Sequence, residues 1–362
     1  MAPSVELLIA NSNRARRFSF KFEHEIFNRQ NHWAVQEREE QIPSEEIFNR
    51  FLPPGLVSLE WEAGGNITAI NRGSFINLPE PFVERSLGNL QSMSLRNTFT
   101  GPVHGVKNLR SFHLAYTGEL SPDVTVWRLY EFLSRNLTLE RIFLEGCTPI
   151  PDLEREAPTG LVVLNHLTAL KLERVDVPSF FGVASMPSLG TITSVYLDPL
   201  ASVMKVNSSN GLVEIYTSPS AWDTIRTFME VKIDSFHISG NPPPPLGFRQ
   251  HSWRLLLHKV PTFKTLQIAG NIEGYKEALV LSPSLEPDHF PSLETLRLDP
   301  NFNASTAAFQ AIAEIAESRA KRGRHLTKVE CLGVVGGSAI KKWKELYDQH
   351  SIQDHLLCES ES

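Results

Sequence analysis

Residues that could act as nucleophiles, acid–base groups or metal ligands do not form a known catalytic motif in this sequence. The chain has no G-x-x-x-x-G-K-[ST] phosphate loop, no G-x-S-x-G turn and no C-x-x-C pair. His24 and Glu25 begin an H-E-x-x-H zinc motif, but Asn28 occupies the place of the second histidine. Residues 333–338 are glycine-rich and precede a predicted helix, yet the rest of a phosphate-binding motif is missing. We therefore predict a protein that is not an enzyme and has no cofactor or metal ion.

A second group of residues is better suited to recognising a partner than to catalysis. It has aromatic side chains in the middle and charged or amide side chains to either side, as protein-binding patches do. Each member occupies the same outward position of a strand motif that recurs along the chain. The candidate partner-binding residues are His113, Phe143, Lys171, Tyr196, His237, Gln267 and Arg297. The alternative is that Phe and Tyr occur there only because they favour strands.

The motif is clearest in residues 293–301, which read L-x-x-L-x-L-x-x-N. On a strand, Leu296 and Leu298 point to one face, whereas Thr295 and Arg297 point to the other. This is the strand segment of a leucine-rich repeat.

The same pattern recurs along most of the chain. Copies begin at Leu56, Leu90, Leu109, Leu139, Leu167, Ile192, Ile233, Phe263, Leu293 and Leu326, with a weaker copy at Leu212. Their mean spacing is about 27 residues, which lies within the range of leucine-rich repeats. In leucine-rich repeats an inward-turned Asn or Cys at the ninth position bonds backbone groups at the bend. Four copies follow this rule, with Cys147, Asn241, Asn271 and Asn301.

The segments between the strands carry helical signals. Ser121 is a predicted N-cap, followed at helical spacing by Val126, Leu129, Tyr130 and Leu133. Ser305 is a second predicted N-cap, for a helix that ends in a basic turn at Arg319 and a glycine stop at Gly323. The apolar face of that helix is predicted to hold Phe309, Ile312, Ala313 and Ala316. Shorter helices are predicted around Trp222 and Trp253, and a final helix around Trp343.

Repeated strand–helix units give parallel strands joined by right-handed crossovers. The predicted fold class is α/β, a leucine-rich-repeat solenoid with parallel strands on the concave face and helices and loops on the convex face. The predicted parts are an irregular N-terminal cap (1–55), the solenoid (56–337) and a C-terminal capping helix with its tail (338–362). Within the cap, residues 18–22 alternate Phe with polar residues and predict a strand.

The outward residues should form one row across the concave face. Adjacent strands lie about 4.8 Å apart, so the row from Glu60 to Glu330 would span roughly 50 Å. Its predicted centre is aromatic, at Phe143, Tyr196 and Tyr216, and its ends carry rim charges. We expect a protein partner to bind there.

Composition narrows the class of partner and the compartment. A formal net charge of -6 argues against a general nucleic-acid-binding protein. No apolar run is long enough for a membrane helix, and the N-terminus is too acidic for a signal peptide. Three widely separated cysteines predict reduced thiols. The expected location is cytoplasmic or nuclear, without membrane attachment.

Residues 42–53 are similar to the opening line of an F-box, L-P-x-E-L-L-x-x-I-F-x-x-L. A complete F-box continues through further helices, whereas here the repeat strand beginning at Leu56 follows at once. We interpret residues 42–53 as a connecting helix.

The segments LERIFLEGC, FKTLQIAGN, LETLRLDPN and LTKVECLG resemble those of F-box/leucine-rich-repeat proteins from mushroom-forming (basidiomycete) fungi. The resemblance covers the chain from about residue 56, and a complete F-box is not evident. It implies that the repeats hold a target protein and that an F-box docks to the adaptor of a cullin-type ubiquitin ligase.

The predicted function is protein recognition, as the substrate receptor of an F-box-type ubiquitin ligase. Two alternatives remain open. One is a free-standing leucine-rich-repeat scaffold, and the other is a regulator of an enzyme or a GTPase.

Overall fold

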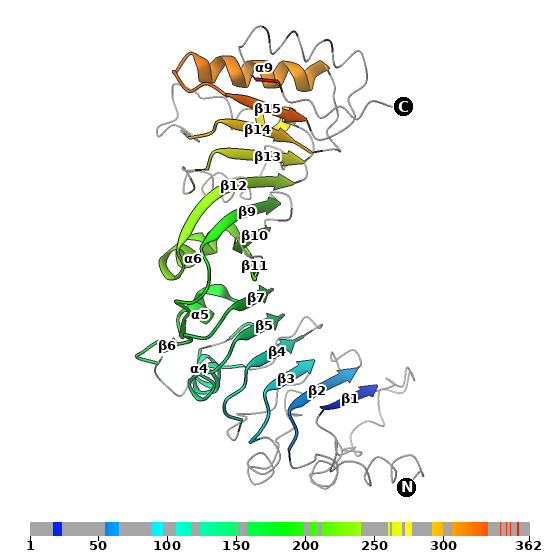
Figure 1. Ribbon diagram of the computed structural model, residues 1–362, viewed down its shortest axis with the longest axis vertical. Helices are drawn as coiled ribbons and strands as arrows, with labels where there is room; N and C mark the ends of the chain where they lie inside the picture. Colours follow the sequence, from blue (N-terminus) through cyan, green and yellow to red (C-terminus); the bar gives the residue numbers. More distant parts are fainter. Residues whose placement is uncertain are drawn as a thin grey trace, which may run out of the picture. The chain divides into compact units, whose positions relative to one another are not determined.

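The computed structural model divides the chain into two compact units, Met1–Leu189 (unit 1) and Gly190–Ser362 (unit 2). The chain is a mixed α/β protein with mostly parallel strands (Figure 1). All the candidate partner-binding residues lie among those that the structure describes. The described residues are 17–23, 55–64, 88–96, 106–116, 124–149, 151–152, 156, 158–198, 201, 203–208, 212–239, 260, 263–269, 272–276, 292–299, 306–331, 341, 345, 348 and 353–354.

The main strands of unit 1 follow one another in chain order, each parallel to the next. Each of the strands from β2 onward begins two residues after the first leucine of a motif copy, as at Leu90 and Leu139. The strands are β1 (Arg17–Glu23), β2 (Ser58–Gly64), β3 (Ser92–Arg96), β4 (Ser111–Ala115), β5 (Arg141–Glu145) and β7 (Ala169–Glu173). The strand predicted at residues 18–22 is therefore confirmed as part of β1.

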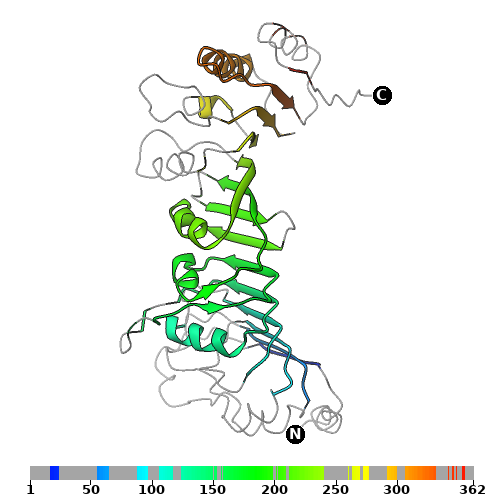
Figure 2. The ribbon, with the colours of Figure 1, turned by 60° about the vertical axis from the view of Figure 1, so that its left-hand side comes forward.

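The first, fourth and sixth motif positions form the core of unit 1. The buried motif residues are Leu56, Leu59, Leu90, Met93, Leu95, Leu109, Phe112, Leu114, Leu139, Ile142, Leu144, Leu167, Leu170 and Leu172. Helices α4 (Val126–Arg135) and α5 (Val177–Phe181) lie on the same side of these strands in Figures 1 and 2. Phe132 of α4 packs against Phe112 of β4, with ring centroids 4.3 Å apart. The side chains of the outward residues lie on the opposite face of these strands.

The N-cap of α4 differs from the prediction. The helix begins at Val126, and the Thr125 hydroxyl accepts a hydrogen bond from the Arg128 backbone N–H at 3.2 Å. Ser121 is therefore not its cap and lies outside the described residues. Phe132 is buried whereas Tyr130 is only half-buried, because Phe132 faces the sheet.

Two elements of unit 1 were not predicted. Helix α5 begins after Asp176, whose carboxylate accepts a hydrogen bond from the Ser179 backbone N–H at 3.1 Å. A small parallel sheet pairs β6 (Val162–Val163) with β8 (Ala184–Ser185).

The bend after β5 confirms the predicted inward turn at Cys147. Its side chain is 0% exposed, and burial raises the pKa of the thiol to about 12. Gly146 precedes it with a φ of +64°, and a Cβ there would lie 2.4 Å from the Tyr116 carbonyl oxygen. Only glycine fits this bend without displacing backbone.

Unit 2 contains a second run of parallel strands. In order of pairing these are β9 (Ile192–Asp198), β12 (Val231–Ser239), β13 (Thr265–Ala269), β14 (Thr295–Leu298), β15 (Lys328–Cys331) and β16 (Gln353–Asp354). Their buried motif residues include Val195, Leu197, Phe236, Ile238, Leu266, Ile268, Leu296, Leu298 and Val329. The predicted burial of Leu296 and Leu298 is confirmed.

The parallel pattern is interrupted by an antiparallel insertion. Strand β10 (Val203–Ser208) pairs antiparallel with both β9 and β11 (Val213–Thr217). The weaker copy at Leu212 was predicted as one more member of the parallel series, but its strand β11 pairs with the inserted β10 and not with β9, although β11 and β9 run in the same direction. Its fourth position, Ile215, is buried as the motif predicts, whereas its first position, Leu212, is 47% exposed and the adjacent Val213 is buried instead.

The helices of unit 2 cover the buried side of its strands. They are α6 (Trp222–Phe228), α9 (Thr306–Ala320) and two 3-10 helices, Pro219–Ala221 and Ile272–Tyr275. Phe309 and Ile312 of α9 are buried as predicted, whereas Ala313 is half-buried. Arg319 is also buried, and its guanidinium donates to the Leu293 carbonyl at 3.0 Å. The glycine stop is confirmed at Gly323, whose φ is +69°.

Several predictions fall outside the described residues. These concern residues 42–53 and 333–338, the caps and ladder positions Ser305, Asn241, Asn271 and Asn301, and the apolar residues Trp253 and Trp343. Among the described residues, no helix is long and apolar enough to cross a membrane.

Candidate functional site

The outward row of unit 1 is formed by the fifth motif position on five neighbouring strands. Strand register places its members side by side in the order Glu60, Ser94, His113, Phe143 and Lys171. The row forms because residues on both sides of each outward side chain point into the core. The predicted residues His113, Phe143 and Lys171 are therefore neighbours, as expected.

His113 contacts both of its neighbours in the row. Its Nδ1 lies 3.2 Å from the Ser94 hydroxyl, and its ring meets that of Phe143 edge-on at 6.1 Å. Burial lowers the pKa of His113, and the positive charge of Arg96 lowers it further. The imidazole is consequently neutral at pH 7 and contributes a half-buried aromatic surface.

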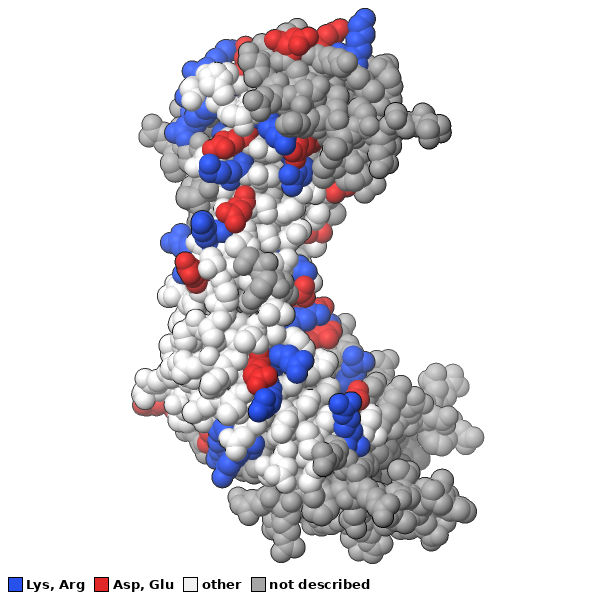
Figure 3. Space-filling view, in the orientation of Figure 1, with Lys and Arg blue, Asp and Glu red and all other residues white. Residues whose placement is uncertain are grey.

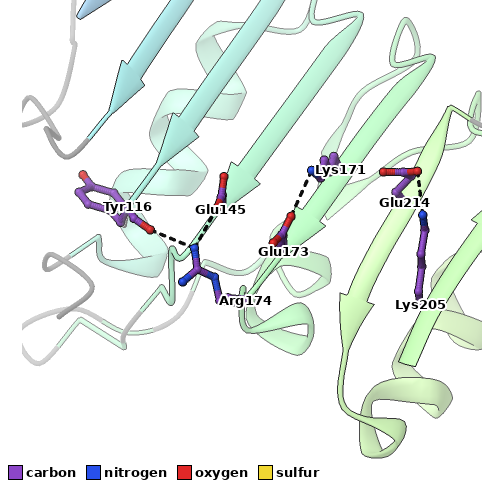
Figure 4. Close-up of polar contacts among 7 residues, drawn as sticks. All are labelled: Tyr116, Glu145, Lys171, Glu173, Arg174, Lys205 and Glu214. Atoms are coloured by element: carbon purple, nitrogen blue, oxygen red, sulfur yellow. Dashed lines mark hydrogen bonds and ion pairs between the residues drawn. The ribbon is translucent and has the colours of Figure 1, made fainter. Parts of the chain in front are cut away.

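Two ion pairs lie along strands β5 and β7 of unit 1 (Figure 4). Lys171 pairs with Glu173 at 3.1 Å on the same strand. Arg174 pairs with Glu145 at 2.8 Å and donates to the Tyr116 carbonyl at 3.4 Å. The position of Lys171 is thus set by an adjacent carboxylate.

The outward row of unit 2 is longer. Register places its members in the order Tyr216, Lys205, Tyr196, His237, Gln267, Arg297 and Glu330. Lys205 was missed because β10 was not predicted, and it separates Tyr196 from Tyr216. A detectable signal was the alternation of buried Met204 and Val206 with Lys205.

Tyr196 and His237 form a stacked pair at the middle of this row. Their ring centroids are 4.2 Å apart and their planes differ by 15°. The Ser235 hydroxyl lies 3.2 Å from His237 Nε2. Burial lowers the pKa of His237, the charge of Arg297 lowers it further, and a hydrogen bond with Gln267 acts in the opposite sense. His237 is therefore neutral at pH 7, so the pair forms an uncharged aromatic ridge.

Lys205 is held by two partners on β11. Its ammonium lies 3.0 Å from the Glu214 carboxylate (Figure 4). The ammonium also lies 4.9 Å from the centre of the Tyr216 ring. Burial acts to lower the pKa of Lys205, but hydrogen bonds with Tyr216 and Glu214 outweigh it and raise the pKa. Lys205 is therefore a positioned cation that covers one aromatic ring.

Arg297, Lys328 and Glu330 form an ion-pair cluster at the other end of the row. Arg297 Nε lies 2.5 Å from Glu330, and Lys328 bonds the same carboxylate. Burial acts to raise the pKa of Glu330, but the bonds from Lys328 and Arg297 outweigh it and lower the pKa. The Glu330 side chain is only 13% exposed. It was predicted as a rim charge, but its position shows that it anchors Arg297 instead.

The chemistry of the two rows suits non-covalent contact. The Ser94–His113 pair lacks a carboxylate that would orient the imidazole, since no described carboxylate hydrogen-bonds His113. No group of three His, Cys, Asp or Glu side chains in the described ranges is placed to hold a metal ion. What the rows offer is aromatic surface beside paired charges.

Unit 1 also contains an open cleft that was not predicted. It has a volume of about 470 Å³ and lies where β2 to β5 begin, away from the outward row. Its lining includes the exposed ion pair between Arg110 and Glu140, 3.2 Å apart, and the polar side chains of Asn89, Gln91 and Asn108.

No protein-family model matches the sequence, and no curated protein matches it significantly. The resemblance to fungal F-box/leucine-rich-repeat proteins therefore rests on the repeat motifs alone and stays a prediction.

Proposed function

We propose that the chain is a leucine-rich-repeat solenoid that recognises a protein through the outward rows of its sheet. The observation that carries this proposal is the stacked Tyr196–His237 pair, held in register among polar neighbours in unit 2. Tyr196 is 40% exposed, so part of its surface remains accessible to a partner although its ring is stacked on His237. Tyrosine is enriched among the residues that dominate protein interfaces, because it buries a large surface at little entropic cost.

Charge distribution supports a protein partner rather than a polyanion. On the face drawn in Figure 3, Lys and Arg are interspersed with Asp and Glu instead of being gathered by sign. Mixed charge around an aromatic centre sets partner specificity and association rate. Nucleic-acid binding would need a basic surface, and the net charge is -6.

We further propose that the recognised protein is a ubiquitin-ligase substrate, which follows from the F-box/leucine-rich-repeat resemblance. The two rivals are a scaffold without a ligase and a regulator of one enzyme or GTPase. Catalysis is not part of the proposal. Each alternative predicts a different set of co-purifying proteins.

The test is capture of partners on the immobilised full-length chain from a basidiomycete extract, followed by mass spectrometry. Ligase adaptor subunits support the substrate receptor, their absence with a stable partner supports the scaffold, and one enzyme or GTPase supports the regulator. The double change Phe143→Ala with Tyr196→Ala should weaken capture by at least about 2 kcal/mol, roughly thirtyfold.

A suitable control is Leu212→Ala, since Leu212 is an exposed apolar residue outside the rows. Glu60→Ala is a second control, because a charge at the edge of the row chiefly alters association rate. If both controls weaken capture as much as the aromatic double change, the binding surface lies elsewhere.

A further inference from the structure

Arg297 differs from the other cation of the unit 2 row in how it is paired. Lys205 is engaged by both Glu214 and Tyr216. Arg297 uses its Nε on Glu330, and it makes no other hydrogen bond with any residue in the described ranges. A guanidinium has five donors, so its two terminal nitrogens have no hydrogen-bond partner among the described residues. The Arg297 side chain is 37% exposed, which makes those nitrogens accessible.

The cluster around Arg297 carries one uncompensated positive charge. Glu330 is shared between two cations, Arg297 and Lys328, so one carboxylate balances two positive groups. The nearby pair Lys264–Glu294, 3.0 Å apart, is neutral in sum. His237, two strands away, is neutral at pH 7 and adds no charge of either sign. Asp299, two residues after Arg297 on the same face, adds one carboxylate to this end of the row, so the preference for an anion is confined to the Arg297 guanidinium.

One net charge and a single accessible guanidinium fit a carboxylate. The fork of an arginine binds a carboxylate through two parallel hydrogen bonds. A phosphate carries nearly two negative charges and is usually held by a cluster of arginines. An acidic side chain is thus the better match in charge.

Strand spacing gives the distance between this anion site and the aromatic ridge. His237 lies on β12 and Arg297 on β14, with Gln267 of β13 between them in register. Two strand spacings amount to about 10 Å. An extended peptide advances about 3.3 Å per residue and turns every second side chain to the same side, so side chains four positions apart face the row together at a separation of about 13 Å. This separation matches the span from Arg297 to the stacked pair, since His237 lies two strands away and Tyr196 three strands away.

We propose that the outward row of unit 2 binds an extended acidic segment of a partner protein. In that segment an Asp or Glu is held by Arg297. An aromatic or large aliphatic residue, four positions away, packs on Tyr196 and His237. This inference rests on the proposed protein-binding function and adds the chemistry of the bound segment.

The test is selection from a displayed library of random twelve-residue peptides on the full-length chain. The wild-type chain should enrich peptides with Asp or Glu four positions from an aromatic or aliphatic residue. With Arg297→Gln, enrichment of the acid should fall at least tenfold while that of the aromatic residue persists. Arg297→Lys, which keeps the charge and loses the fork, should give an intermediate result.

The control variant is Lys264→Gln, which removes one positive charge from the same region outside the row and should leave selection unchanged. Melting curves confirm that each variant is folded. Aromatic enrichment without an acid preference would overturn the inference and leave protein binding intact. If Tyr196→Ala selects the same peptides as the wild-type chain, both this inference and the proposed protein-binding function are overturned. A tenfold preference for phosphoserine over glutamate in matched synthetic peptides would overturn the carboxylate assignment.

Discussion

The side-chain amide of Asn136 joins two backbone segments of unit 1 through three hydrogen bonds. Its Oδ1 accepts from the Leu109 backbone N–H at 3.0 Å, and its Nδ2 donates to the carbonyls of Val106 and Phe132 at 3.2 and 2.8 Å. The residue is 0% exposed, so water cannot replace these bonds. One asparagine thereby joins the end of α4 to the turn before β4.

Asn136→Ala should destabilise the protein by about 2 to 3 kcal/mol, because it leaves buried backbone groups of two segments unpaired. Asn89→Ala, at an exposed asparagine, should stay within about 0.5 kcal/mol of wild type. Urea unfolding followed by fluorescence measures both. Similar losses for the two variants would contradict the bonding role assigned to Asn136.

The titration of His237 tests the electrostatics of the unit 2 row. Burial and the charge of Arg297 hold its pKa below the ordinary value of 6.5. The folded state consequently binds fewer protons than the unfolded state, and stability should fall as pH drops below about 6.5. The loss should continue until pH reaches the folded-state pKa.

Arg297→Gln should move the pKa of His237 upward, because one of its two lowering influences is removed while burial remains. Proton NMR of the imidazole measures the shift. Lys232→Gln, at an exposed lysine on the same strand, serves as the control and should leave the titration in place. A downward or absent shift with Arg297→Gln would mean that the guanidinium does not act on His237.

Among the elements, α4 offers a direct test of local capping. Thr125→Ala removes the hydroxyl that accepts from the Arg128 N–H and should cost about 1 kcal/mol. Ser218 occupies the corresponding cap position of the 3-10 helix Pro219–Ala221, but its hydroxyl accepts no backbone N–H of that helix and hydrogen-bonds the Ser220 hydroxyl instead. Ser218→Ala should therefore cost clearly less in the same thermal unfolding experiment. The reverse order would contradict the assigned caps.

The register of β11 gives a second test at this scale. Ile215→Ala should cost about 2 to 5 kcal/mol because Ile215 is fully buried. Leu212→Ala should cost less than about 0.5 kcal/mol because Leu212 lies at the surface. Chemical denaturation measures both changes. If Leu212→Ala proved the costlier, Leu212 would be the buried first residue of a regular repeat.

The strands were predictable from sequence where one rule, alternation with a preceding leucine, applied without interruption. Leu296 and Leu298 illustrate this, since both lie in the core. β10 was not predictable by that rule, because it is an inserted antiparallel strand without a motif leucine. The cap at Thr125 was missed because Ser121 is equally suited by residue type, and only the helix start distinguishes them.

The candidate site was predictable to the same degree. The outward row follows from period-two alternation, so His237, Gln267 and Arg297 were placed correctly as neighbours. The sharing of Glu330 by Arg297 and Lys328 was not predictable, because it depends on side-chain conformations between strands. The stacking of Tyr196 on His237 was not predictable either, because it also depends on side-chain conformations between strands.

At the scale of the whole molecule, two compact units with strand-to-strand packing imply local responses to core mutations. Where each strand packs mainly on its two neighbours in a sheet, most of its stabilising contacts are with those neighbours. Leu298→Ala should therefore increase amide hydrogen exchange mainly in β13, β14 and β15. Leu144→Ala should do so mainly in β4, β5 and β7.

Hydrogen–deuterium exchange with mass spectrometry measures this in both variants. Each variant is the internal control for the other, because the two leucines are equally buried and lie in different units. A uniform increase across both units for either variant would show instead that the chain unfolds as a single cooperative body.

The antiparallel insertion has a consequence for the order of folding. Lys205 and Glu214, which meet across β10 and β11, are nine residues apart in sequence, whereas Arg297 and Glu330 of β14 and β15 are 33 apart. Closing the shorter loop costs about 1 kcal/mol less entropy, and hairpins form within about 1–10 µs. We expect β9, β10 and β11 to nucleate unit 2 and to present the open edge of β9 to β12. The parallel strands then add in order from β12 toward β15, so the side chains of the outward row are brought together beginning with Lys205 and Tyr216.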